Sequence, residues 1–258
     1  MTIRFAASLT FLFTEVPMLE RPQWATQAGF DGVEVQFPYD HPVDSWQKAL
    51  GGIPLVLINT PPGDWLAGER GFAACPGSEA HFRDSFLRAA DYAAALGVPV
   101  VHVMAGLAQG EEAAAVFAEN LAWAAKQAPE LKLALEPLNP QDMPGYFLND
   151  YDQAARIIGD LDEPRIGLQF DLWHAMRLYG DARRAWERHR QHVLHVQISG
   201  FPGRHEPGGG GFSILDLCAD VAGMQDVWVA AEYMPANGTA QGLSWLKALK
   251  SRDQPIGE

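Results

Sequence analysis

The amino-acid sequence predicts a (β/α)8 TIM barrel that forms one α/β domain over residues 1–258. Eight short apolar runs recur along the chain with helix-like stretches between them, and this alternation is typical of a parallel sheet covered by helices. The length of 258 residues is also normal for a barrel made of one domain. An open doubly wound sheet is the alternative. It should carry a glycine-rich turn after its first strand, and the sequence has none there.

The predicted strands are the eight apolar runs. Several of these runs are continuous, as in Val-Pro-Val-Val-His-Val-Met at residues 98–104, which indicates strands buried on both faces of a parallel sheet. We predict strands at residues 3–9, 32–36, 54–59, 98–105, 131–136, 166–171, 193–199 and 227–232.

Apolar residues spaced three or four apart predict helices between the strands. The clearest stripe runs from Phe82 to Leu96, with Ser78 as the expected N-cap and Gly97 as the expected stop. Further helices are predicted at residues 111–128, 152–161, 181–191, 214–223 and 240–249, and Gly29 and Gly223 stand where helices should end. The glycine-rich run at residues 207–211 is too short for a linker and predicts a loop.

Composition narrows the class of partner. With 19 Lys and Arg against 32 Asp and Glu, the chain carries a formal charge of −13. This charge disfavours binding to nucleic acids and to anionic membranes, and no apolar stretch is long enough to cross a bilayer. Cys75 and Cys218 are a poor disulfide framework and fit a reducing cytoplasm. A homo-oligomer is compatible with the sequence.

An oxygen-bearing side chain lies at or near the carboxyl end of each of the last four predicted strands. These residues are Glu136, Asp171, Gln197 and Glu232. Because the carboxyl ends of barrel strands meet at one mouth, these side chains should converge, and three carboxylates that share a pocket repel one another. A divalent cation resolves this conflict, and an all-oxygen ligand set favours Mg²⁺ or Mn²⁺. We therefore predict that these four residues form one metal site.

The chain resembles the hydroxypyruvate isomerase family, within the xylose isomerase-like barrels. The resemblance covers nearly the whole chain, and its most specific stretches are Asn-Thr-Pro-Pro-Gly-Asp-Trp-Leu-Ala-Gly-Glu-Arg-Gly at 59–71, Leu-Glu-Pro-Leu-Asn at 135–139, Gln-Phe-Asp-Leu-Trp-His at 169–174 and Arg-His-Glu-Pro-Gly at 204–208. It implies an isomerase of small hydroxy-oxo acids that converts hydroxypyruvate to tartronate semialdehyde. It also implies that Glu136 and Glu232 bind the metal and transfer protons, with Asp171 and Gln197 completing the metal shell.

The expected chemistry needs a proton removed from one carbon and returned to its neighbour through an enediolate, which two carboxylates flanking a metal can perform. The substrate carboxylate needs a guanidinium partner. Arg70 is our first candidate for it and Arg204 our second. We also assign His174, Asp142 and Asn59 to substrate binding.

Several alternatives stay open. The residues around Glu15, His102 and Arg204 are similar to those of 2-oxotetronate isomerases, so the substrate could carry four carbons. A ketose 3-epimerase is disfavoured because Gln197 stands where such enzymes have histidine. Metal-dependent DNA-repair endonucleases share the broad fold, but the charge of −13 opposes a DNA groove. A non-catalytic sugar-acid binding protein would not need two carboxylates placed to move protons.

Overall fold

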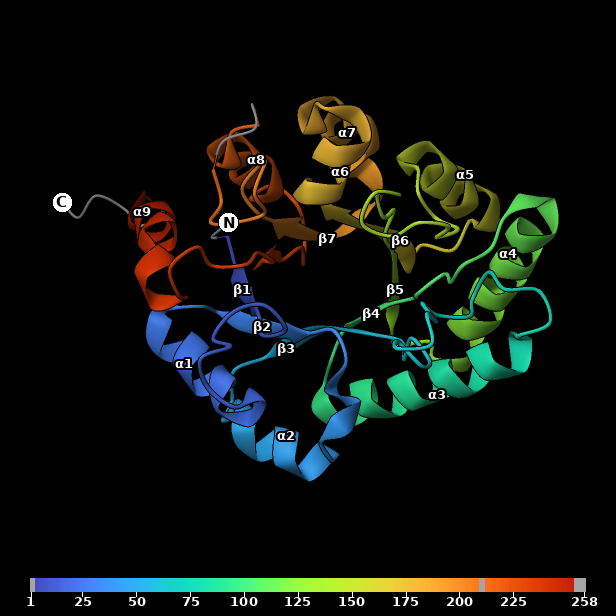
Figure 1. Ribbon diagram of the computed structural model, residues 1–258, viewed down its shortest axis with the longest axis horizontal. Helices are drawn as coiled ribbons and strands as arrows, with labels where there is room; N and C mark the ends of the chain where they lie inside the picture. Colours follow the sequence, from blue (N-terminus) through green and yellow to red (C-terminus); the bar gives the residue numbers. More distant parts are fainter. Residues whose placement is uncertain (1–2, 209–211, 253–258) are drawn as a thin grey trace.

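The eight strands form a closed parallel barrel in the order β1-β2-β3-β4-β5-β6-β7-β8, which confirms the predicted fold. Figure 1 shows the helices as a ring around these strands. The computed structural model describes residues 3–208 and 212–252. The predicted domain 1–258 and the predicted loop 207–211 therefore extend beyond the described residues.

Each strand falls within the apolar run predicted for it. The strands are β1 Phe5–Ser8, β2 Gly32–Val35, β3 Leu55–Asn59, β4 Val100–His102, β5 Lys132–Leu135, β6 Ile166–Asp171, β7 Val193–Ile198 and β8 Val229–Ala231. Every neighbouring pair, including β1 with β8, is parallel. All carboxyl ends therefore open at one mouth of the barrel.

Helices connect the strands on the outside of the barrel. They are α1 Arg21–Ala28, α2 Val43–Leu50, α3 Glu79–Leu96, α4 Gly110–Gln127, α5 Tyr151–Leu161, α6 Leu172–Tyr179, α7 Ala182–His189, α8 Ile214–Val221 and α9 Ser244–Arg252. The apolar periodicity predicted no ranges for α1, α2 and α6. Within the described residues, no helix is both long and apolar enough to cross a membrane.

The structure differs from the sequence prediction at three helix ends. Ser78 does occupy the N-cap position of α3, but its side chain makes no capping hydrogen bond. The predicted helix at 240–249 divides into a 3-10 turn at Ala240–Gly242 and α9. Gly97 ends α3 in the left-handed region at a φ of 69°, whereas α8 already ends at Val221 and Gly223 lies beyond it.

Apolar side chains close the amino-terminal end of the barrel. This floor consists of Ala6, Val56, Leu57, Val100, Ala134, Trp228 and Ala230. A Cβ on Gly32 would lie 2.8 Å from the ring of Trp228, so the glycine makes room for the indole. From outside, the guanidinium of Arg4 lies 4.4 Å from the centre of the same ring.

Above the floor the barrel interior is polar. Buried side chains there include those of Ser8, Glu34, His102, Gln169 and His195. The strand register shifts between Val33 and Glu34, where β2 pairs with β3, and again between Leu168 and Gln169, where β6 pairs with β7. Such irregularities redirect side chains, and they are common next to functional sites.

Candidate active site

The structure brings the four predicted ligands to the carboxyl-terminal mouth of the barrel. Glu136 follows β5, Asp171 ends β6, Gln197 lies near the end of β7 and Glu232 follows β8. All four are buried, with exposed fractions of 6%, 0%, 1% and 3%. Their role as metal ligands stays a prediction, but the convergence on which it depends is present.

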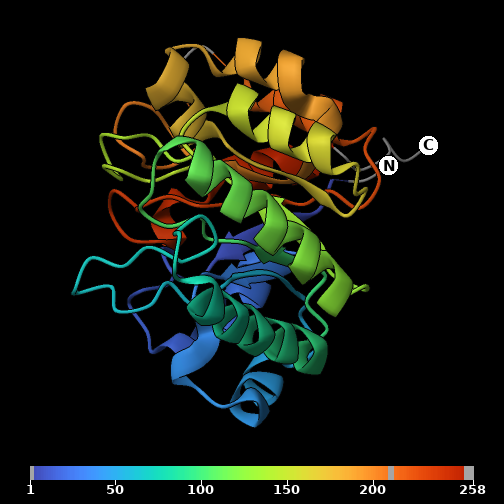
Figure 2. The same ribbon diagram turned by 90° about the vertical axis from the view of Figure 1, so that its right-hand side faces the viewer.

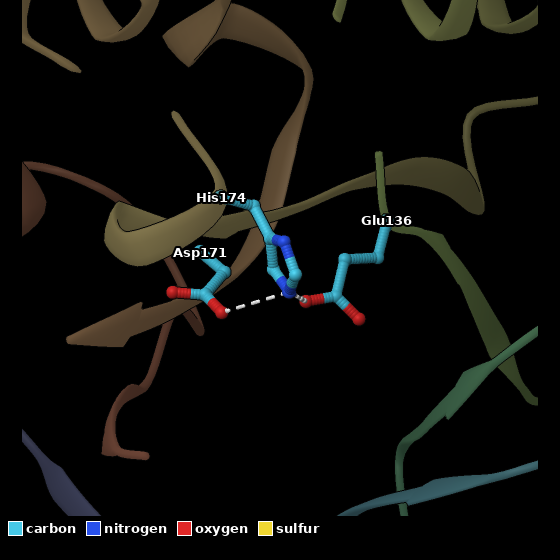
Figure 3. Close-up of side chains that lie close together, drawn as sticks. All are labelled: Glu136, Asp171 and His174. Atoms are coloured by element: carbon cyan, nitrogen blue, oxygen red, sulfur yellow. Dashed lines mark ion pairs between the residues drawn. The ribbon is translucent and has the colours of Figure 1, made fainter. Parts of the chain in front are cut away.

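Asp171 connects the end of β6 directly to the start of α6. Its Oδ1 accepts a hydrogen bond from the backbone N–H of Trp173 at 2.8 Å, which caps the helix. One turn later, the helix presents His174 to the same pocket. The Nε2 of His174 lies 3.6 Å from Oδ2 of Asp171 and 4.0 Å from Oε1 of Glu136 (Figure 3).

The other ring nitrogen of His174 determines the tautomer. Its Nδ1 lies 3.0 Å from the backbone nitrogen of Asn139, which can only donate. Burial, followed by the charge of Arg204, holds the pKa of His174 well below its usual value, so the ring is neutral. The proton of the neutral ring must then sit on Nε2. His174 thus presents an N–H donor to the pocket between Asp171 and Glu136.

Arg204 is the cation at the centre of the site. One guanidinium nitrogen, Nη2, contacts Oδ2 of Asp171 at 3.0 Å and Oε2 of Glu232 at shorter range. Desolvation lowers the pKa of Arg204, but the carboxylates of Glu232, Asp171 and Glu136 outweigh it and raise the pKa above its usual value. The residue stays charged and bridges two predicted metal ligands.

The three carboxyl groups hold protons more tightly than ordinary carboxyls. Burial raises the pKa of Asp171 to about 6 and that of Glu232 to about 8, and Arg204 opposes both shifts. Burial, then the charges of Glu232 and Asp171, raises the pKa of Glu136 well above its usual value. Desolvation and mutual repulsion are the causes, and a bound cation would relieve both.

The donor chemistry fits a divalent cation. Glu136, Asp171 and His174 each offer an atom within 4.8 Å of the other two. With its proton on Nε2, however, His174 has no lone pair to give on that side, so we favour the oxygen atoms of Glu136, Asp171, Gln197 and Glu232 as the ligands. Oxygen ligands are those that Mg²⁺ and Mn²⁺ prefer.

Asn59 and Asp142, which were predicted to bind the substrate, have different surroundings. Asn59 ends β3, and its Oδ1 is buried without a hydrogen-bond partner. Asp142 is on the rim, where its Oδ2 accepts hydrogen bonds from Asn139 Nδ2 at 2.9 Å and Trp173 Nε1 at 2.6 Å. Through Asn139 it helps to orient His174.

Arg70 contacts residues of its own loop. Its Nη1 donates to the carbonyl oxygens of Trp65 and Glu69, and its guanidinium lies 3.6 Å from the centre of the Trp65 ring. These contacts are all within the loop at residues 60–78, the teal segment that projects from the left side of the molecule in Figure 2. Arg204 therefore lies among the predicted metal ligands, whereas Arg70 contacts its own loop, and which of the two binds the substrate carboxylate stays a prediction.

Glu34, Gln169 and Gln36 are polar residues of the site that were not predicted from the sequence. Glu34 contacts Gln197 and His195, Gln169 donates to Gln197, and Gln36 donates to Glu232 Oε1 at 3.1 Å. The signal for Glu34 was present, because Val33-Glu34-Val35 places one charged residue inside an apolar strand. A buried charge of this kind requires partners.

The chain matches the family model described as xylose isomerase-like TIM barrel over residues 22–249. It is 40% identical to a 2-oxo-tetronate isomerase of Cupriavidus necator, covering 96% of this chain and 99% of the relative. It is 36% identical to a hydroxypyruvate isomerase of Escherichia coli, covering 95% of this chain and 98% of that one.

A solved structure shows the same architecture. A crystal structure from Brucella melitensis, titled as an AP endonuclease of family 2, superimposes with a TM-score of 0.90 at 39% identity. The alignment covers 96% of this chain and 99% of that one.

Proposed function

The chain belongs to the xylose isomerase-like TIM barrel family, and we propose that it is an isomerase that moves a proton between neighbouring carbons of a short hydroxy-oxo acid. The reaction is hydroxypyruvate to tartronate semialdehyde, or the isomerisation of 2-oxotetronate on the same site. Relatives with both names align over nearly the whole chain at 36–40% identity. The observation that carries the proposal is the pair of buried carboxyl groups of Glu136 and Glu232 at one mouth.

The two glutamates suit a reaction that needs one base and one acid. Removal of a proton from the hydroxyl-bearing carbon needs a base, return of a proton to the neighbouring carbon needs an acid, and the hydroxyl proton must pass from one oxygen of the enediolate to the other. A carboxylate can serve as the base and a carboxylic acid as the acid, so one glutamate would fill each role. The reverse reaction exchanges the two roles.

Two other side chains suit the charge that develops on the substrate. The Nε2–H of His174 points into the pocket and can donate to an enediolate oxygen. The guanidinium of Arg204 can pair with the substrate carboxylate. A divalent cation held by Glu136, Asp171, Gln197 and Glu232 would stabilise the negative charge of the enediolate. Mg²⁺ or Mn²⁺ is the ion that we propose.

The surroundings favour a small anion over a nucleic acid or a membrane as the partner. The Brucella structure has a nuclease title, yet relatives of similar identity and coverage have isomerase names. A net charge of −13 opposes binding to DNA phosphates. We also propose a cytoplasmic location, because two cysteines 143 positions apart in the sequence make a poor disulfide framework.

The test is an NMR assay of the Mg²⁺- or Mn²⁺-loaded protein with hydroxypyruvate and 2-oxotetronate in parallel, in deuterated water. We expect turnover of at least one acid, abolished by a chelator, with solvent deuterium entering the product. A protein that binds either acid but exchanges no C–H would be a binding protein. That result would overturn the proposal.

Single variants then separate the two glutamates. The variant that lacks the proton donor, but not the acceptor, should exchange the substrate hydrogen with deuterium without forming product. The variant that lacks the acceptor should do neither. Glu136→Gln and Glu232→Gln therefore assign the two roles, and full activity in both variants would contradict the mechanism.

A further inference from the structure

Glu34 is a buried carboxylate that the proposed reaction does not use. It lies in β2 and is 1% exposed. The register shift between Val33 and Glu34 lies at its own position. A buried carboxylate costs free energy unless hydrogen-bond donors surround it, so its partners indicate what it does.

Both partners of Glu34 come from β7 on the far side of the barrel. Its Oε1 accepts a hydrogen bond from Gln197 Nε2 at 2.8 Å, and its Oε2 lies 2.7 Å from His195 Nε2. His195 and Gln197 are two residues apart in one strand, so their side chains point to the same face. One carboxylate thus holds a predicted metal ligand and its neighbour.

The contacts of Gln197 select one of the two orientations of its amide. Its Nε2 faces Oε1 of Glu34 and, at 3.2 Å, Oε1 of Glu232. Its Oε1 accepts a hydrogen bond from Gln169 Nε2 at 2.8 Å. The carboxylate oxygens disfavour the flipped amide, because they would then face the oxygen of Gln197 instead of its N–H donor. Because Gln169 also stands at a register shift, both irregularities of the barrel place a partner of Gln197.

We propose that Glu34 is a positioning residue that fixes the Gln197 amide so that its carbonyl oxygen, and not its nitrogen, is available to the divalent cation. A glutamine binds a cation only through that oxygen, which keeps a second lone pair beside the bond from Gln169. This inference rests on the metal site of the proposed function. Glu34 acts through Gln197 and contacts no reacting atom in this account.

The test measures Mn²⁺ binding by calorimetric titration of the metal-free full chain, without substrate. Glu34→Gln should weaken Mn²⁺ binding by about 10- to 100-fold, the usual effect of removing a group that orients a ligand. Gln197→Glu should also weaken binding, because it sets two carboxylates against each other across the former hydrogen bond. If Glu34 did not face residue 197, the carboxylate that Gln197→Glu adds would instead strengthen Mn²⁺ binding.

The double variant Glu34→Gln with Gln197→Glu supplies the rescue. It exchanges the ends of the amide–carboxylate contact and keeps the net charge of the pocket, so most of the lost Mn²⁺ affinity should return. A purely structural role of Glu34 predicts that the two losses add. Asp142→Asn is the matched control, because Asp142 also raises the pKa of Asp171 but has no described contact with Gln197. It should weaken Mn²⁺ binding far less than Glu34→Gln does.

The outcomes separate this inference from the proposed function. Wild-type affinity in Glu34→Gln, or a double variant that binds no better than Gln197→Glu, would overturn the inference alone. A wild-type protein that binds no Mn²⁺ would overturn the proposed metal site, and the inference with it. If Glu34→Gln fails to fold in thermal unfolding, the comparison of Gln197→Glu with the double variant still decides.

Discussion

Asp171 divides its two carboxylate oxygens between structure and function. Oδ1 caps α6 through Trp173 N, while Oδ2 faces Arg204 and His174. Asp171→Asn keeps an oxygen for the cap, whereas Asp171→Ala loses it. We expect Asp171→Ala to be less stable than Asp171→Asn by about 1 kcal/mol, with isomerase activity lost in both. Denaturant unfolding and the NMR assay measure the two effects, and equal stability of the two variants would contradict the capping role.

Arg204 occupies oxygens that a metal would also use. Arg204→Met removes a cation from beside Asp171 and Glu232, so Mn²⁺ affinity should rise by about tenfold, equivalent to ~1.4 kcal/mol. The same change removes the partner of the substrate carboxylate, so kcat/KM should fall by roughly 10- to 100-fold, the value of a charge-assisted hydrogen bond.

The Arg204 prediction is specific because Arg204→Met should raise the Mn²⁺ affinity and lower kcat/KM. Arg70→Met is the control, because Arg70 contacts Trp65 and Glu69 within its own loop. A larger loss of kcat/KM in Arg70→Met than in Arg204→Met would restore the order expected from sequence.

Site residues could be predicted from the sequence only where they follow an apolar strand. Glu136, Asp171, Gln197 and Glu232 do, and their place at the carboxyl-terminal mouth was predicted. The contacts of Arg204 with two of them could not be foreseen, because it lies in a loop whose path no periodic pattern fixes. Arg204 adopts a φ of 53°, a conformation that an arginine sequence does not signal.

At the scale of elements, strands were easier to predict than short helices. Buried parallel strands are continuous apolar runs, so all eight were located. Helix α6 was missed because no loop precedes it, and Asp171 is both the last residue of β6 and the N-cap of α6. The start signal for α6 is Asp171 itself, which the apolar run assigns to the strand.

The loop between β3 and α3 depends on two glycines for different reasons. Gly68 and Gly71 have φ values of 93° and 100°, but only at Gly71 would a Cβ collide, 2.4 Å from the carbonyl oxygen of Met104. Gly68→Ala should cost about 1–2 kcal/mol of unfolding free energy from the left-handed backbone. Gly71→Ala should cost a further ~1–3 kcal/mol from the collision.

Thermal or denaturant unfolding of the two glycine variants isolates the collision, because the backbone penalty is common to both. The collision would also disturb the bridge between Gly71 and Ala105, which ties the loop to the segment after β4. Equal destabilisation by the two substitutions would show that the loop can move away from Met104.

At the scale of the whole molecule, the buried carboxyl groups link stability to pH. Burial raises the pKa of Asp171 to about 6 and of Glu232 to about 8, above the ordinary values of 3.8 and 4.5. The metal-free folded protein therefore binds more protons than the unfolded chain over this range. The stability that protonation confers is full below about pH 4 and is lost as pH rises through 6 and then 8.

A bound cation takes the place of these protons. We therefore expect the rise in Tm on adding Mn²⁺ to grow between about pH 6 and pH 8. Burial keeps His174 and His102 neutral and gives the opposite slope at lower pH, so the measured quantity is the difference between metal-loaded and metal-free Tm. Glu232→Gln should flatten that difference, and a pH-independent shift in the wild type would contradict the linkage.

The closed barrel itself was predictable because strand count, alternation and length all agree with it. What the sequence did not reveal is the division of the interior into an apolar floor and a polar upper half. Gly32 and Trp228 are 196 positions apart in the printed sequence, and only strand closure brings the glycine under the indole. Contacts of this range leave no local pattern.

The apolar floor of the barrel determines how substrate and product enter and leave the enzyme. With Trp228 and its apolar neighbours packed across the amino-terminal end, a reactant that reaches Glu136 and Glu232 must leave by the opening through which it came. Substrate and product therefore enter and leave by the same opening, and each prevents the other from binding while it is bound. The direction of net conversion is then set, as for any catalyst, by the concentrations of the two acids relative to their equilibrium ratio.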